Sequence, residues 1–276
     1  MPKRIKLAIL PALITLLLSS LLLSSTINAQ PQTEIEQQRL AKAQEDYSYQ
    51  FSKYEDCHNQ YINNRSAYIA FQTTTAKNNA FLTTKDCLTK IYDVYIAYIR
   101  YIKEQGNAFN WSKDDTEKNV IFKTLDDEIT YFQNTQPNVG NLQTLEDTIP
   151  YASELKTHIT KTTYLIIQKA LATYEVAESE AALENFTNLS AKIRSFVTTR
   201  IDQNQYSSFL ANWDSEIADI KSHSENYNSQ ARQALTTFNP ILSDSGSIDS
   251  VSSFTKKTKA ELLRSKAIFA EILKLI

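Results

Sequence analysis

Apolar residues recur at steps of three or four along most of this chain, and that spacing is the strongest constraint on its fold. One stripe keeps the spacing for nine successive steps, at Tyr206, Phe209, Trp213, Ile217, Ile220, Ser224, Tyr227, Ala231, Ala234 and Phe238. A mean spacing near 3.5 residues is typical of helices that pack lengthwise against one another. No segment alternates with a period of two for long enough to predict a strand.

Glycine and proline are scarce, which also favours long helices. The 276 residues include 3 Gly and 6 Pro, whereas folds rich in strands and loops need more turn residues. Gly106, Gly140 and Gly246 each stand where a helical pattern stops, with Pro137 and Pro240 in the same breaks. Glycine is common just beyond the end of a helix, so we interpret these breaks as helix ends.

These patterns predict an all-α fold, an elongated antiparallel helical bundle of coiled-coil-like hairpins with about five to six long helices. The expected helices cover about 33–71, 77–105, a shorter segment through 121–132, 144 or 150 to 198, 204–238, and a last segment that ends at the C-terminus. We expect residues 30–135 to form a helical hairpin plus a short third helix. Residues 141–276 are expected to form a three-helix segment packed with the first as one unit.

The first 29 residues have the layout of a secretory signal peptide. Basic residues precede an apolar run over residues 7–23, and the small residue Ala29 closes the segment. The apolar run exceeds the usual ~7–15 residues, so an uncleaved membrane anchor formed by residues 7–27 is the alternative. Both interpretations place residues 30–276 outside the cytoplasm, in a secreted or cell-surface protein.

Cleavage would leave a mildly acidic chain. Removal of three basic residues lowers the Lys and Arg count from 29 to 26, against 31 Asp and Glu, for a net charge of about −5. Phosphate binding needs a basic surface, so nucleic acid is not an expected partner. A membrane is an expected partner only through the N-terminal segment, if that segment is retained.

Cys57 and Cys87 are the two cysteines of the chain, and their midpoint is residue 72. The weakest helical sequence between them, Phe71–Thr75, indicates a turn at that midpoint. Two residues equidistant from a helix–helix turn face each other, so we predict a disulfide in this exported chain. A metal or redox site that uses Cys57 and the adjacent His58 is the alternative.

Tyr47, Tyr54, Tyr61 and Tyr68 recur every seven residues in the first predicted helix. A tyrosine can fill a narrow helical seam with its ring and keep its hydroxyl at the wet edge. Packing alone requires this period, and we favour that interpretation. The alternative is an aromatic interaction surface formed by these four rings.

Sequence motifs for catalysis are absent. There is no nucleophile elbow, no glycine-rich phosphate loop and no H-E-x-x-H. Glu55 and His58 form a single E-x-x-H, whereas carboxylate-bridged metal sites in bundles need a second copy and further inward glutamates. We therefore assign no catalytic, cofactor-binding or metal residues, and we expect no enzyme.

The sequence therefore predicts an exported, non-enzymatic helical protein that acts as a structural spacer or protein-interaction surface at the cell envelope. Its expected partner is another envelope or extracellular protein, or a second copy of the chain. The alternative is an extracytoplasmic helical-bundle module that binds a ligand or senses one.

Overall fold

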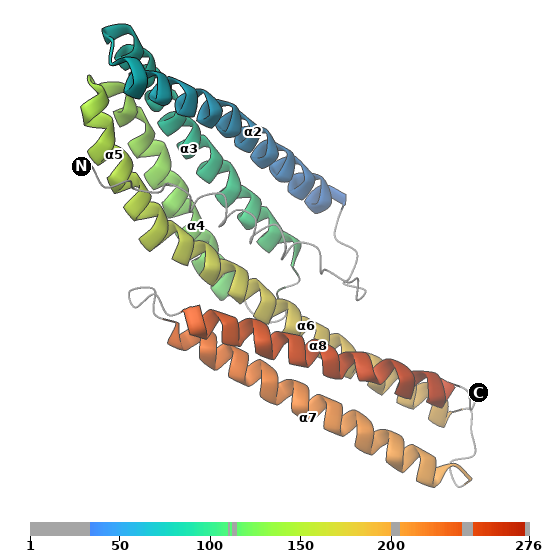
Figure 1. Ribbon diagram of the computed structural model, residues 1–276. Helices are drawn as coiled ribbons and strands as arrows, with labels where there is room; N and C mark the ends of the chain where they lie inside the picture. The colour runs from blue at the N-terminus through green and yellow to red at the C-terminus, as the bar shows by residue number, and fades with distance from the viewer. Residues whose placement is uncertain (1–33, 110, 112–114, 200–204, 239–244, 274–276) are drawn as a thin grey trace. The chain divides into compact units, whose positions relative to one another are not determined.

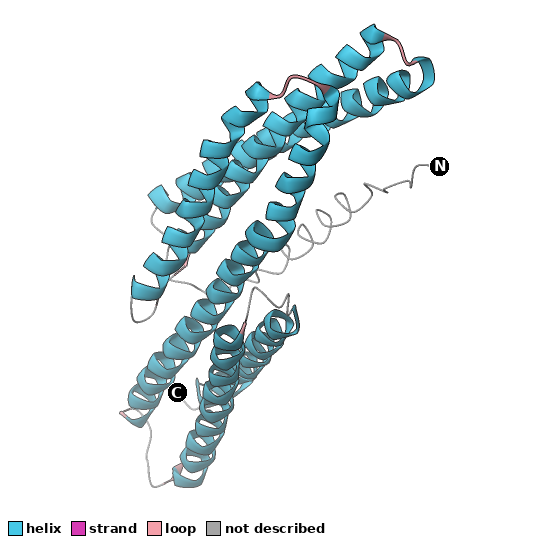
Figure 2. Cartoon of the chain, turned by 90° about the vertical axis from the view of Figure 1, so that its left-hand side faces the viewer, coloured by secondary structure: helices cyan, strands magenta, loops and turns pink. Residues whose placement is uncertain are grey.

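The computed structural model describes residues 34–109, 111, 115–199, 205–238 and 245–273, which are almost entirely helical (Figure 1, Figure 2). The predicted all-α bundle of antiparallel helices is confirmed, and these residues contain no strand. All the described helices belong to one unit, Gln32–Ile276. The predicted signal peptide or anchor, residues 1–29, lies outside the described residues.

The first two helices form a hairpin whose turn lies where the sequence predicts it. Helix α2 spans Glu34–Phe71 and helix α3 spans Thr74–Ala108. Gln72 takes a positive φ of 50°, and the side chain of Thr73 accepts a hydrogen bond from the backbone N–H of Ala76. The turn therefore reverses the chain in two residues and caps the second helix.

A short helix and one very long helical segment follow the hairpin. The elements are α4 (Asp115–Thr135), the 3-10 helix η2 (Gln136–Asn141), α5 (Leu145–His158), the π-helical turn η3 (Ile159–Thr163) and α6 (Tyr164–Thr198). Thr144 and Asp147 form a capping box that starts α5. Of the two predicted starts, residue 144 is therefore correct and residue 150 is not. From Leu145 to Thr198 the backbone stays helical, as predicted, with a π turn in its course.

Helix α3 lies at the centre of the larger core. It packs against α2 on one side and against α4, α5 and α6 on others. The predicted apolar stripe of α4 faces this core, and its members are all buried: Ile121, Leu125, Ile129 and Phe132. Burial of these stripes supplies the hydrophobic stabilisation of this half of the bundle.

The remaining helices are α7 (Ser207–Thr237) and α8 (Ser245–Leu273), which pack against each other and against α6. Helix α6 belongs to both parts of the bundle, because Tyr174 lies in the larger core whereas Val176 contacts α7 and α8 side chains (Figure 1). The core of α6, α7 and α8 is divided into small apolar clusters. Between two of them, the buried hydroxyls of Ser179 and Thr258 both donate hydrogen bonds to Oδ1 of the buried Asn228.

The breaks that contain the glycines do hold helix ends, as predicted, but two of the glycines lie inside a helix rather than beyond its end. Gly106 lies within α3 and Gly246 lies within the first turn of α8, while Gly140 lies in the 3-10 helix η2. At Gly106 the missing Cβ makes room for the ring of Tyr174. Close packing, rather than helix termination, therefore explains this glycine.

Candidate functional site

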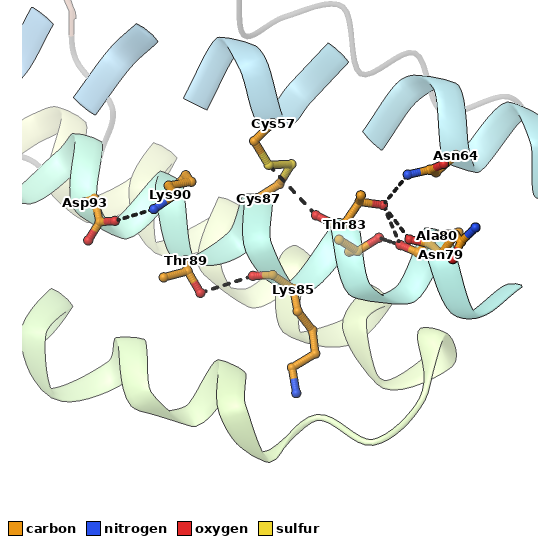
Figure 3. Close-up of a disulfide and its surroundings, with 11 residues drawn as sticks. Cys57, Asn64, Asn79, Ala80, Thr83, Lys85, Cys87, Thr89, Lys90 and Asp93 are labelled. Carbon is orange, nitrogen blue, oxygen red and sulfur yellow. Dashed lines mark hydrogen bonds and ion pairs between the residues drawn. A yellow bond between two sulfur atoms is a disulfide. The ribbon is translucent and has the colours of Figure 1, made fainter. Parts of the chain in front are cut away.

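The predicted disulfide between Cys57 and Cys87 is present and ties α2 to α3 (Figure 3). The two Cα atoms lie 5.5 Å apart, and the exposed fractions of the residues are 3% and 7%. Cys57 is the one fully buried residue of α2. Two turns away along α3, the fully buried Ala80 has the small side chain that close approach of the two helices requires.

The four tyrosines with the seven-residue period are half-buried along the hairpin. The ring of Tyr47 lies 5.0 Å from that of Tyr98 and 6.2 Å from that of Tyr101, between ring centroids. Burial raises the pKa of the Tyr47 and Tyr54 hydroxyls. Tyr61 packs near the imidazole of His58, with 6.3 Å between the centroids, and Tyr68 is also half-buried.

Tyr47 is thus engaged with α3, and the use of Tyr47, Tyr54, Tyr61 and Tyr68 as an interaction surface stays a prediction. Much of the remaining surface of α2 is exposed. Among the described elements, only α3 packs extensively against α2. Large apolar side chains remain in solvent along this helix, with exposed fractions of 62% at Ile35, 57% at Tyr49, 58% at Ile69 and 73% at Phe71. They lie at different angles around the helix axis, and we call these four residues the exposed apolar residues of α2.

A buried acid–base cluster joins α4 to the π-helical turn. The Oε1 atom of Glu128 lies 2.8 Å from Nε2 of His158 and accepts a hydrogen bond of 2.5 Å from Oγ1 of Thr163. Glu128 is 5% exposed and Thr163 is fully buried. The imidazole of His158 also stacks on the ring of Tyr131, with 3.7 Å between centroids. Two polar partners therefore compensate the burial of one carboxylate.

A short motif such as E-x-x-H does not predict this cluster, because its members are distant in the chain. Glu128 and His158 are 30 residues apart, and Thr163 meets them through the π turn η3. One signal was available: Glu128 stands between Leu125 and Phe132 on the apolar stripe of α4. A glutamate at an inward position predicts a buried partner.

The residues that suggested a metal site do not assemble one in the described part of the chain. No group of three or more His, Cys, Asp or Glu side chains is placed there to hold a metal ion. His58 instead lies between the rings of Tyr54 and Tyr61, and both cysteines are engaged in the disulfide. Within the same residues, no helix has the length and apolar character needed to cross a membrane.

Ion pairs fasten α7 and α8 to the acidic side of α6. Arg232 on α7 binds both carboxylate oxygens of Glu180 at 2.7 and 2.6 Å, and it binds Glu117 of α4 at 2.5 Å. The hydrogen bonds to Glu180 raise the pKa of the Arg232 guanidinium. On α8, Lys259 donates to Glu178 at 3.0 Å. These bonds link helices that are distant in the sequence.

Two hollows lie among α6, α7 and α8. The first, of about 320 Å³, lies between α7 and α8 and is lined by side chains that include Gln230, Gln233, Ser250 and Phe254. The second is a groove of about 200 Å³ between α6 and α7, which we call the α6–α7 groove. Its lining includes Phe186, Arg194, Trp213, Asp214, Ile217 and Lys221.

Comparison with known proteins adds nothing to this geometry. No protein-family model matches the chain, and searches of curated proteins and of solved structures found no match. The function is therefore inferred from the residues and their arrangement.

Proposed function

We propose that this chain is an exported, non-enzymatic helical protein that acts as a spacer or interaction surface at the cell envelope. The observation that carries the proposal is the one-sided packing of α2, a helix of 38 residues against which α3 alone packs extensively among the described helices. A long helix with one side uncovered can present its side chains to another protein. The partner is another envelope or extracellular protein, or a second copy of the chain.

The extracytoplasmic location is part of the same proposal. It is supported by the N-terminal sequence and by the disulfide, because such bonds persist mainly in oxidising compartments. Mass spectrometry of the protein from its native source provides the test. We expect a mature chain that begins at Gln30. An intact Met1 in the membrane fraction would instead support the anchor.

Site-specific photo-crosslinking tests the interaction surface. A photoreactive phenylalanine analogue placed at Tyr49 or Ile69 samples two exposed positions on different sides of α2. The same analogue at Leu263, an exposed position on α8 with an exposed fraction of 46%, is the matched control. We expect one discrete crosslinked product, a heteromeric complex or a dimer, from the α2 positions in the native envelope or secreted fraction. Equal products from Leu263, or none from α2, would contradict the proposal.

A ligand-binding module is the second candidate, and the two hollows among α6, α7 and α8 favour it. Ligand pockets in helical proteins commonly lie between helices and combine apolar walls with a few polar groups. The α7–α8 hollow offers amide and hydroxyl groups beside the ring of Phe254. The α6–α7 groove offers mainly apolar walls with charged residues among its lining.

A further inference from the structure

The interior of the part formed by α6, α7 and α8 differs from the larger core around α3. In the larger core, the buried apolar side chains form one continuous cluster that includes large rings such as Tyr92 and Phe132. Among α6, α7 and α8, the described residues form small clusters instead. The buried members of one are alanines and valines with Leu235, whereas those of the next are Phe186, Ile220 and Leu262. Because hydrophobic stabilisation grows with buried apolar area, small clusters hold their helices together less strongly.

A layer of buried polar side chains separates these two clusters on all three helices. It consists of Ser179 on α6, Ser224 and Asn228 on α7, and Thr255 and Thr258 on α8, each at most 5% exposed. On every helix, these residues lie between the members of one cluster and the members of the other along the chain. We call these five residues the polar layer. The apolar core is therefore interrupted near the middle of each helix.

Hydrogen bonds hold the polar layer together, but their net contribution to stability is small. The hydroxyl groups of Ser179 and Thr258 donate to Oδ1 of Asn228 at 2.6 and 2.9 Å, and Thr255 donates to Glu175 at 3.3 Å. Each of these bonds is replaced by a bond to water when the helices separate. Separation at the polar layer therefore requires less free energy than separation at an apolar layer of the same size.

Outside this core, ion pairs attach α7 and α8 to α6. Their members are partly exposed, and the pairs among the described residues are Arg194–Asp214, Arg232–Glu180 and Lys259–Glu178. The exposed fractions of these side chains lie between 29% and 47%, so water competes for both partners of each pair. Exposed ion pairs contribute much less than a buried apolar core, so they do not compensate for the interrupted one.

We infer that the hairpin of α7 and α8 separates from α6 as a unit while helices α2–α5 stay folded. Helices α7 and α8 contact each other more extensively than either contacts α6, and Arg232 adds a link to Glu117 of α4. Separation uncovers the side of α6 that carries Val176, Phe186 and Val197, all buried in the closed form. The open form therefore presents an apolar helix surface that the closed form hides. This motion is independent of the exposed apolar residues of α2, so its absence would leave the proposed interaction surface untouched.

Native-state hydrogen exchange of the intact protein in low concentrations of urea tests this motion. A helix that loses its cover is marginal in water, so its amides exchange in the open form. We expect residues 176–198 of α6 to exchange in one common step with α7 and α8. Their protection factors should be at least about tenfold lower than those of the slowest amides of α3.

The urea dependence of this step should be smaller than that of global unfolding, because fewer residues become exposed. The inference is wrong if the slowest amides of α7 and α8 have the same protection and the same urea dependence as those of α3. Such a result would show that α6, α7 and α8 unfold only together with the larger core.

A variant with an apolar layer tests the cause of the motion. Ser179→Ala, Asn228→Leu and Thr258→Val together replace the hydrogen-bonded groups by apolar groups of similar size. The protection of α7 and α8 should then rise at least about tenfold. Thr148→Val is the matched control, at a threonine of α5 that is 2% exposed, and it should leave the protection of α7 and α8 unchanged.

Wild-type protection of α7 and α8 in a folded triple variant would also overturn the inference. Should the triple variant not fold, the wild-type exchange pattern alone supports or refutes the separation of the hairpin.

Discussion

The ring of Tyr174 on α6 lies directly over Gly106 on α3. A Cβ atom built at Gly106 would be 2.5 Å from both Cζ and Oη of Tyr174, and 2.8 Å from Cε1 of Phe122 on α4. Tyr174 is 2% exposed, and its burial raises the pKa of the hydroxyl. Three helices therefore meet at a point where one of them has no side chain.

We expect Gly106→Ala to destabilise the protein, although alanine favours a helix by about 1 kcal/mol over glycine. The added methyl group overpacks a rigid contact, which costs about 1–3 kcal/mol, and the large ring has little room to move. The net loss should therefore reach up to about 2 kcal/mol in the free energy of unfolding, measured by urea denaturation.

Gly140→Ala is the matched control for that substitution. Gly140 has no heavy atom within 4 Å of the position of an added Cβ, and its φ is not positive. The free energy of unfolding of the Gly140→Ala variant should stay within about 0.5 kcal/mol of wild type. Equal losses in the two variants would show that the contact with Tyr174 is not the cause. Gly106→Ala combined with Tyr174→Leu should lose less than the sum of the two single changes.

Removal of the disulfide should weaken α2 selectively. The bond between Cys57 and Cys87 closes a segment with a sequence separation of 30, for which the chain-entropy model gives about 3–4 kcal/mol. Cys57→Ser should therefore lower the melting temperature under non-reducing conditions, and hydrogen exchange should increase first in α2. Wild type treated with a reductant while unfolded should match the variant. Two reactive thiols in the unreduced, denatured wild type would refute the bond.

We expect substitution of the buried Glu128 to lower the free energy of unfolding strongly. Glu128→Ala leaves the imidazole of His158 and the hydroxyl of Thr163 without their buried acceptor. Loss of one member of a buried polar cluster typically costs about 3–5 kcal/mol. Asp127→Ala is the control on the same helix: its side chain is 66% exposed and pairs with Lys123, so the loss should be under about 1 kcal/mol. Thermal or urea unfolding of both variants measures the two losses of stability.

The buried tyrosines of the hairpin should make stability fall at alkaline pH. Burial, helped by the nearby Tyr54 and Tyr47, raises the pKa of Tyr95 from 10.0 to about 12. The folded state therefore holds this proton more tightly than the unfolded state. The stabilisation is complete below pH 10 and is lost as the pH rises toward about 12.

Urea midpoints between pH 8 and pH 11 measure this effect. Tyr95→Phe cannot ionise at that position, so its stability should fall less steeply than that of wild type above pH 10. Tyr49→Phe changes a tyrosine with an exposed fraction of 57% and should follow the wild-type slope. Parallel curves for all three proteins would show that Tyr95 ionises alike in both states.

The sequence by itself determined the hairpin of α2 and α3. Its two stripes specify the inner face of each helix, and the Thr-rich break near Gln72 specifies the turn. Because Cys57 and Cys87 lie equally far from that turn, their pairing follows from local information alone. The long helix through Leu145–Thr198 was also predictable, since a helical period depends only on neighbours within a few residues.

Only the tertiary structure decided which side chains meet between helices that are distant in the chain. The period of a stripe states which side of a helix is buried, but not which partner covers it or at what level. Glu128 meets His158, and Gly106 meets Tyr174, through the relative position of α3, α4, α5 and α6 along their axes. That position is set by the packing of many side chains together, which no single stripe encodes. The same is true of the α6–α7 groove, because Arg194 and Trp213 share it only once two helices have packed together.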